Sequence, residues 1–252
     1  MLDVIRMWWH GPLHHTCQLS LASFVAHQHP VQLWTYMDPE SLQLPAGVIH
    51  RDAREVVPES VFRRWIPQGS GVDQRSNRLP TFANYFRYRL IHDLGGWWCD
   101  LDTVCLRPFV FDSPYVFCGR YFDKPEMQQQ YAGQLINGVF KAPAGGILTA
   151  ALLKATESAA VQGEDPGWGV WGPKLFTQCV YDCQLQHYQH PEHIFTPFAP
   201  GETGYRTQYL DPAAVIPSWA YAVHCWNRYT MDRTSSVNSI YDRLSRRYLC
   251  DR

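Results

Sequence analysis

The sequence lacks a strong net charge, a long apolar run and an internal repeat. Its 252 residues carry a formal net charge of −1, so no overall positive field attracts nucleic acid, and nucleic acid is excluded as the main partner. No run approaches the roughly 18 consecutive apolar residues of a membrane-spanning helix. The chain is 46% hydrophobic and 18% charged, which excludes a disordered class and provides enough apolar surface for a packed core.

The amino-terminal segment also lacks the basic start and apolar stretch of a secretory signal. We therefore expect a cytoplasmic protein whose eight cysteines are reduced thiols. Cys179, Cys183 and His187 follow one another at intervals of four residues, with His190 just beyond. This spacing allows a zinc site, but four ligands on one helix make a poor tetrahedral cage, so a half-buried helix face is favoured.

The hydrophobic pattern predicts an α/β fold, with a central mixed sheet and helices on both faces. A helix over 81–94 should end at Gly95–Gly96, and an apolar strand should follow at 97–99. The opening strand–helix–strand order is typical of folds that bind nucleotides at strand ends. Residues 197–217 are rich in proline and turn formers and should be irregular. The other predicted strands are 3–9, 31–36, 48–49, 115–119, 136–142 and 221–226, and the other predicted helices are 13–28, 146–161, 174–183 and 237–249.

Asp100 and Asp102 directly follow the apolar strand at 97–99. Two carboxylates at positions i and i+2 of an extended segment point to the same side. Mg²⁺ and Mn²⁺ prefer such oxygen ligands, usually one or two carboxylates plus substrate phosphates, and a cation held there can neutralise charge on a departing diphosphate. This is the only Asp-x-Asp in the sequence, although a solvated turn is the plain alternative.

The stretch FANYFRYRLIHDLGGWWCDLDTVCLRPF, residues 82–109, resembles the DXD sugar-nucleotide region of glycosyltransferase family 32. That family includes bacterial capsule and lipopolysaccharide transferases and α-1,4-galactosyltransferase-like enzymes, and the glucosylating clostridial toxins are more distantly similar. The order of helix, Gly-Gly, apolar strand and Asp-x-Asp carries the resemblance. The opening IRMWWHGPL, the segment Gly172–Thr177 and AVHCWN at 222–227 are also similar to the family, in family order.

The resemblance implies one GT-A-like catalytic domain over residues 1–252, with the nucleotide-sugar site at the carboxyl ends of the strands. Residues 1–110 would form the nucleotide-sugar-binding half, and 111–252 the acceptor-side half with a carboxyl-terminal helix. The implied reaction is hexose transfer, with retention and with Mn²⁺ or Mg²⁺, from a UDP-sugar or, less favoured, a GDP-sugar. The acceptor would be a glycan or lipid-linked saccharide, as in polysaccharide or lipopolysaccharide biosynthesis.

By position, the resemblance makes Asp102 a direct metal ligand, and Asp100 a sugar or ribose contact that also helps to hold the metal. Arg87 would reach the donor sugar or its phosphate, against the alternative of a surface ion pair. His224 would contact the metal or the diphosphate, against the alternative of a hydrogen-bonded core histidine. Trp9 would stack on the nucleobase, with a core position as its alternative.

Three further residues are expected near the donor: Asn137, Trp226 and Asn227. Asn137 precedes a glycine, so a turn is its alternative. Asn84 marks a departure, because the family usually has an Asp three residues before the arginine. An amide can still hydrogen-bond a sugar hydroxyl, but it lacks charge, which leaves the donor sugar open.

Two other classes of function remain as alternatives. The CDLDTV segment also fits a haloacid-dehalogenase-type phosphatase, in which the first Asp is a nucleophile. That motif normally lies near the amino terminus, and no later aspartate follows a predicted strand as a second metal motif. A sugar-nucleotide-binding protein with little turnover is the non-enzymatic alternative. Residues 67–80 are predicted to close over the donor, and 120–135 and 163–171 are candidate acceptor loops.

The carboxyl-terminal segment 237–252 combines four arginines with apolar residues at helical spacing. A core-packed helix with a solvated basic face is the favoured interpretation. Peripheral contact with an anionic membrane, at its inner face and near lipid-linked acceptors, is the alternative.

Overall fold

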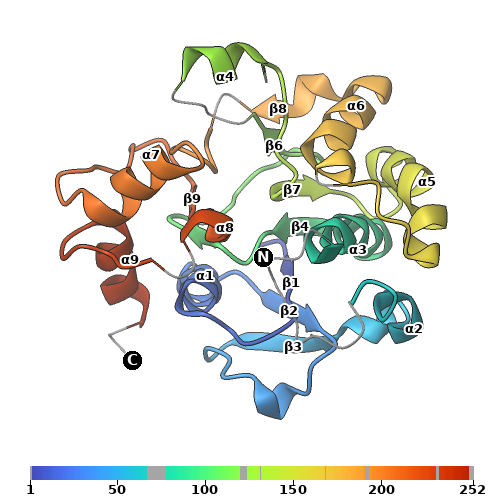
Figure 1. The fold of residues 1–252 in the computed structure, drawn as a ribbon, viewed down its shortest axis with the longest axis horizontal. Helices are drawn as coiled ribbons and strands as arrows, with labels where there is room; N and C mark the ends of the chain where they lie inside the picture. Colours follow the sequence, from blue (N-terminus) through green and yellow to red (C-terminus); the bar gives the residue numbers. More distant parts are fainter. Residues whose placement is uncertain are drawn as a thin grey trace.

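The computed structural model describes residues 2–66, 78–119, 124–130, 132–167, 169–190, 193–230 and 233–249. At its centre lies a five-stranded sheet with the order β3-β2-β1-β4-β7 (Figure 1). The first four of these strands in that order run parallel, and the last is antiparallel to its neighbour β4. The expected α/β fold with a mixed sheet is confirmed. The strands are β1 (Ile5–Trp8), β2 (Val31–Thr35), β3 (Val48–Asp52), β4 (Gly96–Cys99) and β7 (Val139–Ala142).

Side chains point alternately to the two faces of the sheet along each strand, so the core is divided between these faces. Ile5 and Met7 pack into one cluster, whereas Trp8 joins the cluster on the opposite face. Trp8 lies 5.4 Å from Phe82 and 5.7 Å from Phe86 between ring centroids, and such aromatic pairs each contribute about 0.5–1.5 kcal/mol beyond their burial. Trp8 is therefore a core residue.

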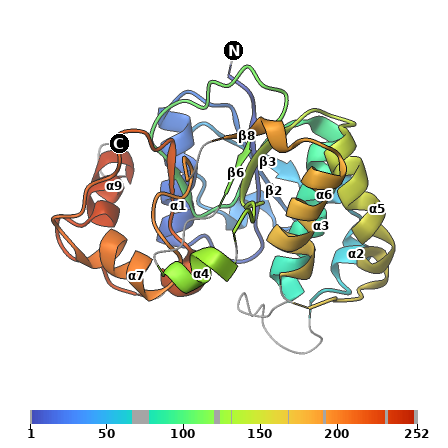
Figure 2. The same cartoon turned by 90° about the horizontal axis from the view of Figure 1, so that it is seen from above.

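Helices cover both faces of the sheet, as expected (Figures 1 and 2). On one side α3 packs against α5, and α5 packs against α6. On the other side α1 packs against both β5 and α9. The ranges are α1 (His15–Ala26), α2 (Glu59–Phe62), α3 (Arg78–Leu94), α5 (Ile147–Gln162), α6 (Leu175–Asp182) and α9 (Ile240–Leu249).

Two small sheets flank the central one. The strand β5 (Thr103–Cys105) pairs antiparallel with β9 (Ala222–His224), and β6 (Phe117–Cys118) pairs in parallel with β8 (Gln189–His190). The first of these pairs brings the last strand of the chain beside the Asp-x-Asp segment. The remaining helices are α4 (Pro125–Gln130), α7 (Glu202–Tyr205) and α8 (Asn227–Thr230).

One prediction about local structure was wrong. Residues 197–217 were expected to be irregular, but they contain α7 followed by a π-helical turn over Arg206–Leu210. Tyr205 and Tyr209 lie four residues apart and are both buried. Tyr209 stacks on Tyr241 of α9 at 4.3 Å between centroids. Burial of these two rings therefore favours helical structure where the proline and glycine content suggested none.

The helix α9 packs by its apolar face onto the protein itself. Ile240, Leu244 and Tyr248 are buried in a cluster with residues of α1 and β9. Arg243 donates to the carbonyls of Pro212, Asn238 and Ala214. This is the core-packed arrangement that the sequence favoured, and the apolar residues that would enter a bilayer are already covered. Within the described ranges, no helix is both long and apolar enough to cross a membrane.

The possible zinc cluster is not assembled. Cys179 is buried in the core on α6, and that helix ends at Asp182. Residues 186–188 then form a separate 3-10 turn, so His187 leaves the helix face that carries the two cysteines. The proposed closing loop falls largely outside the described residues, since only its last three residues are seen, as the start of α3. Parts of both candidate acceptor loops lie outside the described residues as well.

Candidate metal and donor site

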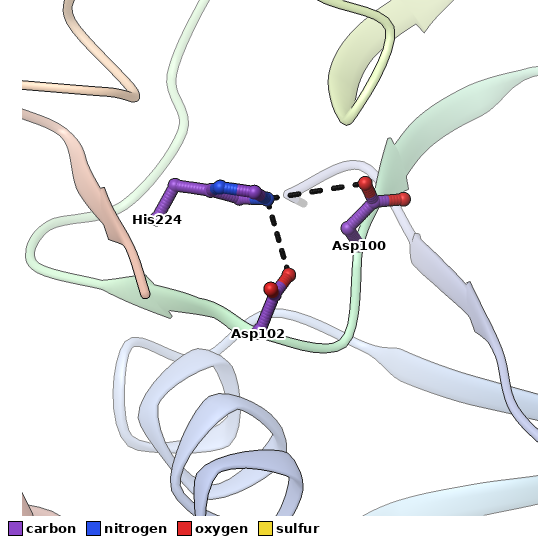
Figure 3. Close-up of side chains that lie close together, drawn as sticks. All are labelled: Asp100, Asp102 and His224. Carbon is purple, nitrogen blue, oxygen red and sulfur yellow. Dashed lines mark ion pairs between the residues drawn. The ribbon is translucent and has the colours of Figure 1, made fainter. Parts of the chain in front are cut away.

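The two aspartates lie where β4 ends and the chain turns into β5. The N–H of Asp100 donates to the carbonyl of Gly138 (2.7 Å), and the N–H of Thr103 donates back to the carbonyl of Asp100 (3.0 Å). The strand β5 is seated on α1, because the hydroxyl of Ser20 donates to the carbonyl of Thr103 (2.6 Å). The turn therefore holds both carboxylates on its inner side at the carboxyl end of β4 (Figure 3).

His224 reaches this turn from the end of β9. Strand pairing places His224 opposite Thr103, and the N–H of Cys225 donates to the carbonyl of Asp102 (2.8 Å). His224 Nε2 lies 3.1 Å from Asp102 Oδ1 and 3.9 Å from Asp100 Oδ2 (Figure 3). One ligand atom from each of the three residues lies within 4.8 Å of the others, which is a spacing that a single bound cation can bridge.

The other carboxylate oxygens are already occupied by protein donors. Asp102 Oδ2 accepts the backbone N–H of Asn227 (2.7 Å). Asp100 Oδ1 accepts the indole N–H of Trp98 (2.8 Å) and lies 3.1 Å from Nη2 of Arg87. Each aspartate is therefore held by one oxygen, and its second oxygen faces His224.

The residues present fit a hard divalent cation. Nε2 of His224 is buried and faces the two carboxylates, without a hydrogen bond of good geometry to either of them, so its position suits a third ligand of a bound cation. Gly138 leaves space beside them, because a Cβ there would lie 2.8 Å from Asp100 Oδ2 and 3.6 Å from His224 Nε2. Two carboxylate oxygens and one imidazole nitrogen form a set of ligands that a divalent cation can accept.

Charge coupling in this cluster shifts two pKa values. Burial alone would raise the pKa of Asp102, but the charge of His224 and the N–H of Asn227 lower it overall. Burial alone would lower the pKa of His224, but the carboxylates of Asp102 and Asp100 raise it to about 9. Without a cation, the imidazole is therefore protonated at neutral pH and supplies the positive charge between the two aspartates.

Arg87 is a buried residue that contacts Asp100 of the acidic pair, and it does not lie on the surface. Its Nη1 donates to the carbonyl of Asn137 (2.6 Å), and its Nε donates to the carbonyl of Ala83 (3.2 Å). The guanidinium lies 4.9 Å from the ring centroid of Trp98, and the side chain is 7% exposed. The structure therefore places the predicted donor-binding arginine directly against Asp100.

Asn84 and Asn137 are joined in a hydrogen-bond chain with a fixed direction. The Tyr88 hydroxyl donates to the carbonyl of Trp171 (2.6 Å), and that carbonyl can only accept. The Asn137 amide therefore donates to Tyr88 (2.9 Å) and to Asn84 Oδ1 (2.7 Å). This order turns the Asn84 NH₂ group away from Asn137 and toward Gly172, where a Cβ would lie 3.5 Å from Nδ2.

The remaining predicted residues lie around the same edge of the sheet. Trp226 packs its ring edge-on to His224, at 4.1 Å between centroids, and its indole N–H donates to the carbonyl of Phe198 (3.3 Å). Asn227 contacts Asp102 through its backbone, not through its side chain. Trp9 is half-buried directly after β1, and its indole N–H donates to the carbonyl of Pro12 (3.0 Å).

Two residues of the site were not predicted from the sequence: Trp98 and Tyr88. Trp98 precedes Asp100 by two residues on an extended segment, so alternation alone places both on one side of the strand. Tyr88 gave no comparable signal, because a tyrosine that packs in the core of a helix has the same spacing.

No protein-family profile and no curated protein sequence matches the chain. Among solved structures, the fold is similar to one titled PaToxG Glycosyltransferase. The TM-score is 0.50 at 16% sequence identity, over 73% of this chain and 69% of that one. At this identity the likeness concerns the fold alone, and it is consistent with a GT-A-like architecture. Membership of family 32 stays a prediction from the sequence motifs.

Proposed function

We propose that the protein is a metal-dependent glycosyltransferase that moves a hexose from a nucleotide-diphosphate sugar, preferably a UDP-sugar, to a glycan hydroxyl. The observation that carries this proposal is the convergence of Asp100, Asp102 and His224 at the carboxyl end of β4. The likeness of the fold to a structure titled as a glycosyltransferase supports it. Ligands of open α/β sheets generally bind at the carboxyl ends of the strands.

In this proposal, Asp100 Oδ2, Asp102 Oδ1 and His224 Nε2 hold Mn²⁺ or Mg²⁺. When bound, such a cation neutralises the charge that develops on the leaving diphosphate. The chain's own contribution is preorganisation. The Asn227 N–H fixes Asp102, and Trp98 and Arg87 fix Asp100, so both carboxylates are oriented before any substrate arrives.

The amide group of Asn84 is proposed to meet the donor sugar. Its NH₂ group can only donate, so it suits a sugar oxygen that accepts, whereas an aspartate at this position would only accept. Arg87 has its three nitrogens engaged with protein oxygens, so we assign it mainly to holding Asp100. Trp9 is proposed to stack on the nucleobase. We also propose retention of anomeric configuration, with the departing phosphate taking the acceptor proton.

Thermal-shift and turnover measurements test this function together. We expect Mn²⁺ with at least one UDP-hexose to raise the melting temperature more than either alone, because a ligand bound only to the folded state stabilises it. Slow hydrolysis of the same UDP-hexose should require the metal and should fall at least a hundredfold in Asp102→Asn. Asp182→Asn, on the exposed side of α6, serves as the matched control.

Two outcomes would reject the proposal. One is that no UDP- or GDP-sugar shifts the melting temperature in the presence of Mn²⁺. The other is metal-dependent release of inorganic phosphate from a simple phosphomonoester that requires Asp100, which would favour the phosphatase alternative. Donor binding without any turnover would favour a sugar-nucleotide-binding protein.

A further inference from the structure

A cavity of about 390 Å³ lies between the 193–199 segment, α7 with its following turn, and the turn that carries Trp219. Among the described residues that line it, none carries a carboxylate, a lysine amine or an arginine guanidinium, so these residues offer no fixed charge to an ionic ligand. The polar side-chain groups of the described lining residues are one imidazole, two threonine hydroxyls and the indole N–H of Trp219. The lining residues are His193, Pro197, Phe198, Ala199, Thr203, Gly204, Thr207 and Trp219.

The walls of this cavity are anchored to the rest of the protein. Arg107 donates to the carbonyls of Ser218 and Ala220 on both sides of Trp219, whose indole nevertheless remains 48% exposed. Gly204, another lining residue, packs closely against the 193–199 segment, since a Cβ there would collide with the carbonyl of Ala199. The cavity is therefore preformed, with an aromatic ring held open to solvent on one side.

One indole joins the cavity to the metal site. The carbonyl of Phe198, a lining residue, accepts the N–H of Trp226 at 3.3 Å. The ring of Trp226 in turn lies 4.1 Å from the ring of His224 between centroids. A ligand in the cavity would therefore lie one side chain away from the proposed metal ligands.

We propose that this cavity binds a neutral saccharide unit of the acceptor; this inference rests on the proposed function. A sugar ring combines an apolar C–H face, which suits the indole of Trp219, with hydroxyls that suit Thr203 and Thr207. The lack of fixed charge among the described lining residues disfavours a phosphate or a nucleotide as occupant. The volume of about 390 Å³ lies in the lower part of the range of roughly 300–1,000 Å³ for small-molecule sites, so it suits one or two sugar rings.

Saturation-transfer NMR on the protein tests the cavity directly. The probes are methyl glycosides of glucose, galactose and mannose, together with maltose and lactose. We expect saturation transfer to at least one of them in the wild type, and its loss in Trp219→Ala. Tyr181→Ala is the matched control, because Tyr181 is an equally exposed aromatic (47%) on α6, outside the cavity. Melting temperature and Mn²⁺ affinity report whether the fold and the metal site remain intact.

A second variant guards against a purely structural effect of removing the indole. Thr203→Val keeps the shape of the cavity wall and removes one hydroxyl, so it should weaken binding of the same saccharide about tenfold without lowering the melting temperature. If that saccharide serves as an acceptor, its KM should rise about tenfold in both cavity variants. The inference would be overturned if the wild type showed no NMR saturation transfer to any of the probes. It would also be overturned if the saturation transfer were unchanged in Trp219→Ala.

The outcomes also separate this inference from the proposed function. Saccharide binding that is lost in Trp219→Ala, in a protein that binds no sugar nucleotide, supports the cavity and rejects the transferase. Metal-dependent hydrolysis of a UDP-hexose in a protein whose cavity binds no saccharide supports the transferase and rejects the cavity.

Discussion

Arg87 reaches Asp100 with a single nitrogen, Nη2, which lies 3.1 Å from Oδ1 of the carboxylate. Its other two nitrogens are committed to backbone carbonyls, those of Asn137 and Ala83. The side chain therefore connects α3, the end of β4 and the segment before β7 through one planar group. This arrangement makes Arg87 a positioning residue for the proposed metal site. A substitution that keeps the positive charge of this side chain but changes its shape tests that role.

Arg87→Lys should weaken Mn²⁺ binding by about 10–100-fold, the usual effect of changing a residue that orients a metal ligand. A lysine carries the same charge, but its compact ammonium cannot bridge the three oxygens at once. Isothermal titration with Mn²⁺ measures the change. Arg89→Lys is the control on the same helix, because Arg89 forms exposed ion pairs with Asp93 and Glu157. Equal affinities in the two variants would show that the guanidinium geometry is unimportant.

The affinity with which the initially metal-free protein binds Mn²⁺ should rise with pH. The carboxylates raise the pKa of His224 to about 9, and only the neutral imidazole binds a metal, so binding must release a proton. Below a pH of about 9, the affinity should increase by up to tenfold per pH unit. Titrations in buffers of different ionisation enthalpy count the released proton. His224→Gln should bind more weakly and lose this pH dependence; a pH-independent affinity in the wild type would contradict the assignment.

The same two groups give the metal-free protein a defined dependence of stability on pH. The pKa of His224 is raised from 6.5 to about 9, so its stabilising effect is complete below about 6.5 and is lost as the pH rises toward 9. The pKa of Asp102 is lowered, so its contribution is present above 3.8 and is lost as the pH falls. The joint contribution of Asp102 and His224 to the free energy of unfolding should therefore be largest between pH 3.8 and 6.5. Urea unfolding measures this contribution, which should be smaller in His224→Gln.

Gly138→Ala should impair metal binding at least tenfold with little change in melting temperature. The added methyl would lie 2.8 Å from Asp100 Oδ2 and 3.6 Å from His224 Nε2, in the space between the ligands. Gly119→Ala is the matched control, because a Cβ there meets its neighbours only at 3.8 Å. Mn²⁺ titration and thermal unfolding of both variants separate loss of the site from loss of the fold. Wild-type affinity in Gly138→Ala would mean that the cation lies elsewhere.

Asn84→Asp should change which donor analogues the protein accepts. The hydrogen-bond chain from Trp171 directs the NH₂ group of Asn84 away from Asn137, and fluorine can only accept a hydrogen bond. A deoxyfluoro UDP-hexose with fluorine facing Asn84 should bind the wild type with little loss and bind Asn84→Asp about tenfold more weakly. Competition against the parent UDP-hexose measures both. Equal tolerance of every fluorinated position would rule out a direct contact with Asn84.

Much of the fold could be predicted from local patterns. The apolar strands β1, β2 and β4 and the helices α3 and α5 are long, strongly patterned or bounded by glycine, and their predicted positions agree with the structure to within a few residues. The strand β5 was missed because it has only three residues and follows a turn directly. The helix α7 was missed because the burial of Tyr205 and Tyr209 depends on α9, which is remote in sequence.

The site was predictable to a different degree for each residue. Asp100 and Asp102 follow from their place at a strand end, which is a local signal. His224 was found only through the family resemblance, since its approach depends on the pairing of β5 with β9. The direction of Arg87 could not be deduced, because a position on a helix does not say which of several nearby oxygens the side chain will contact. The direction of the Asn84 amide needs the whole chain of partners that ends at Trp171.

The pairing of β5 with β9 also has a consequence for biosynthesis. Asp100 and Asp102 leave the ribosome well before His224, so the growing chain carries two of the three ligands while the third has not yet been made. A cation would then find only a weak, open pair of carboxylates until β9 docks along β5. Tight metal capture would thus depend on the docking of β9 along β5, a late contact between segments far apart in the sequence.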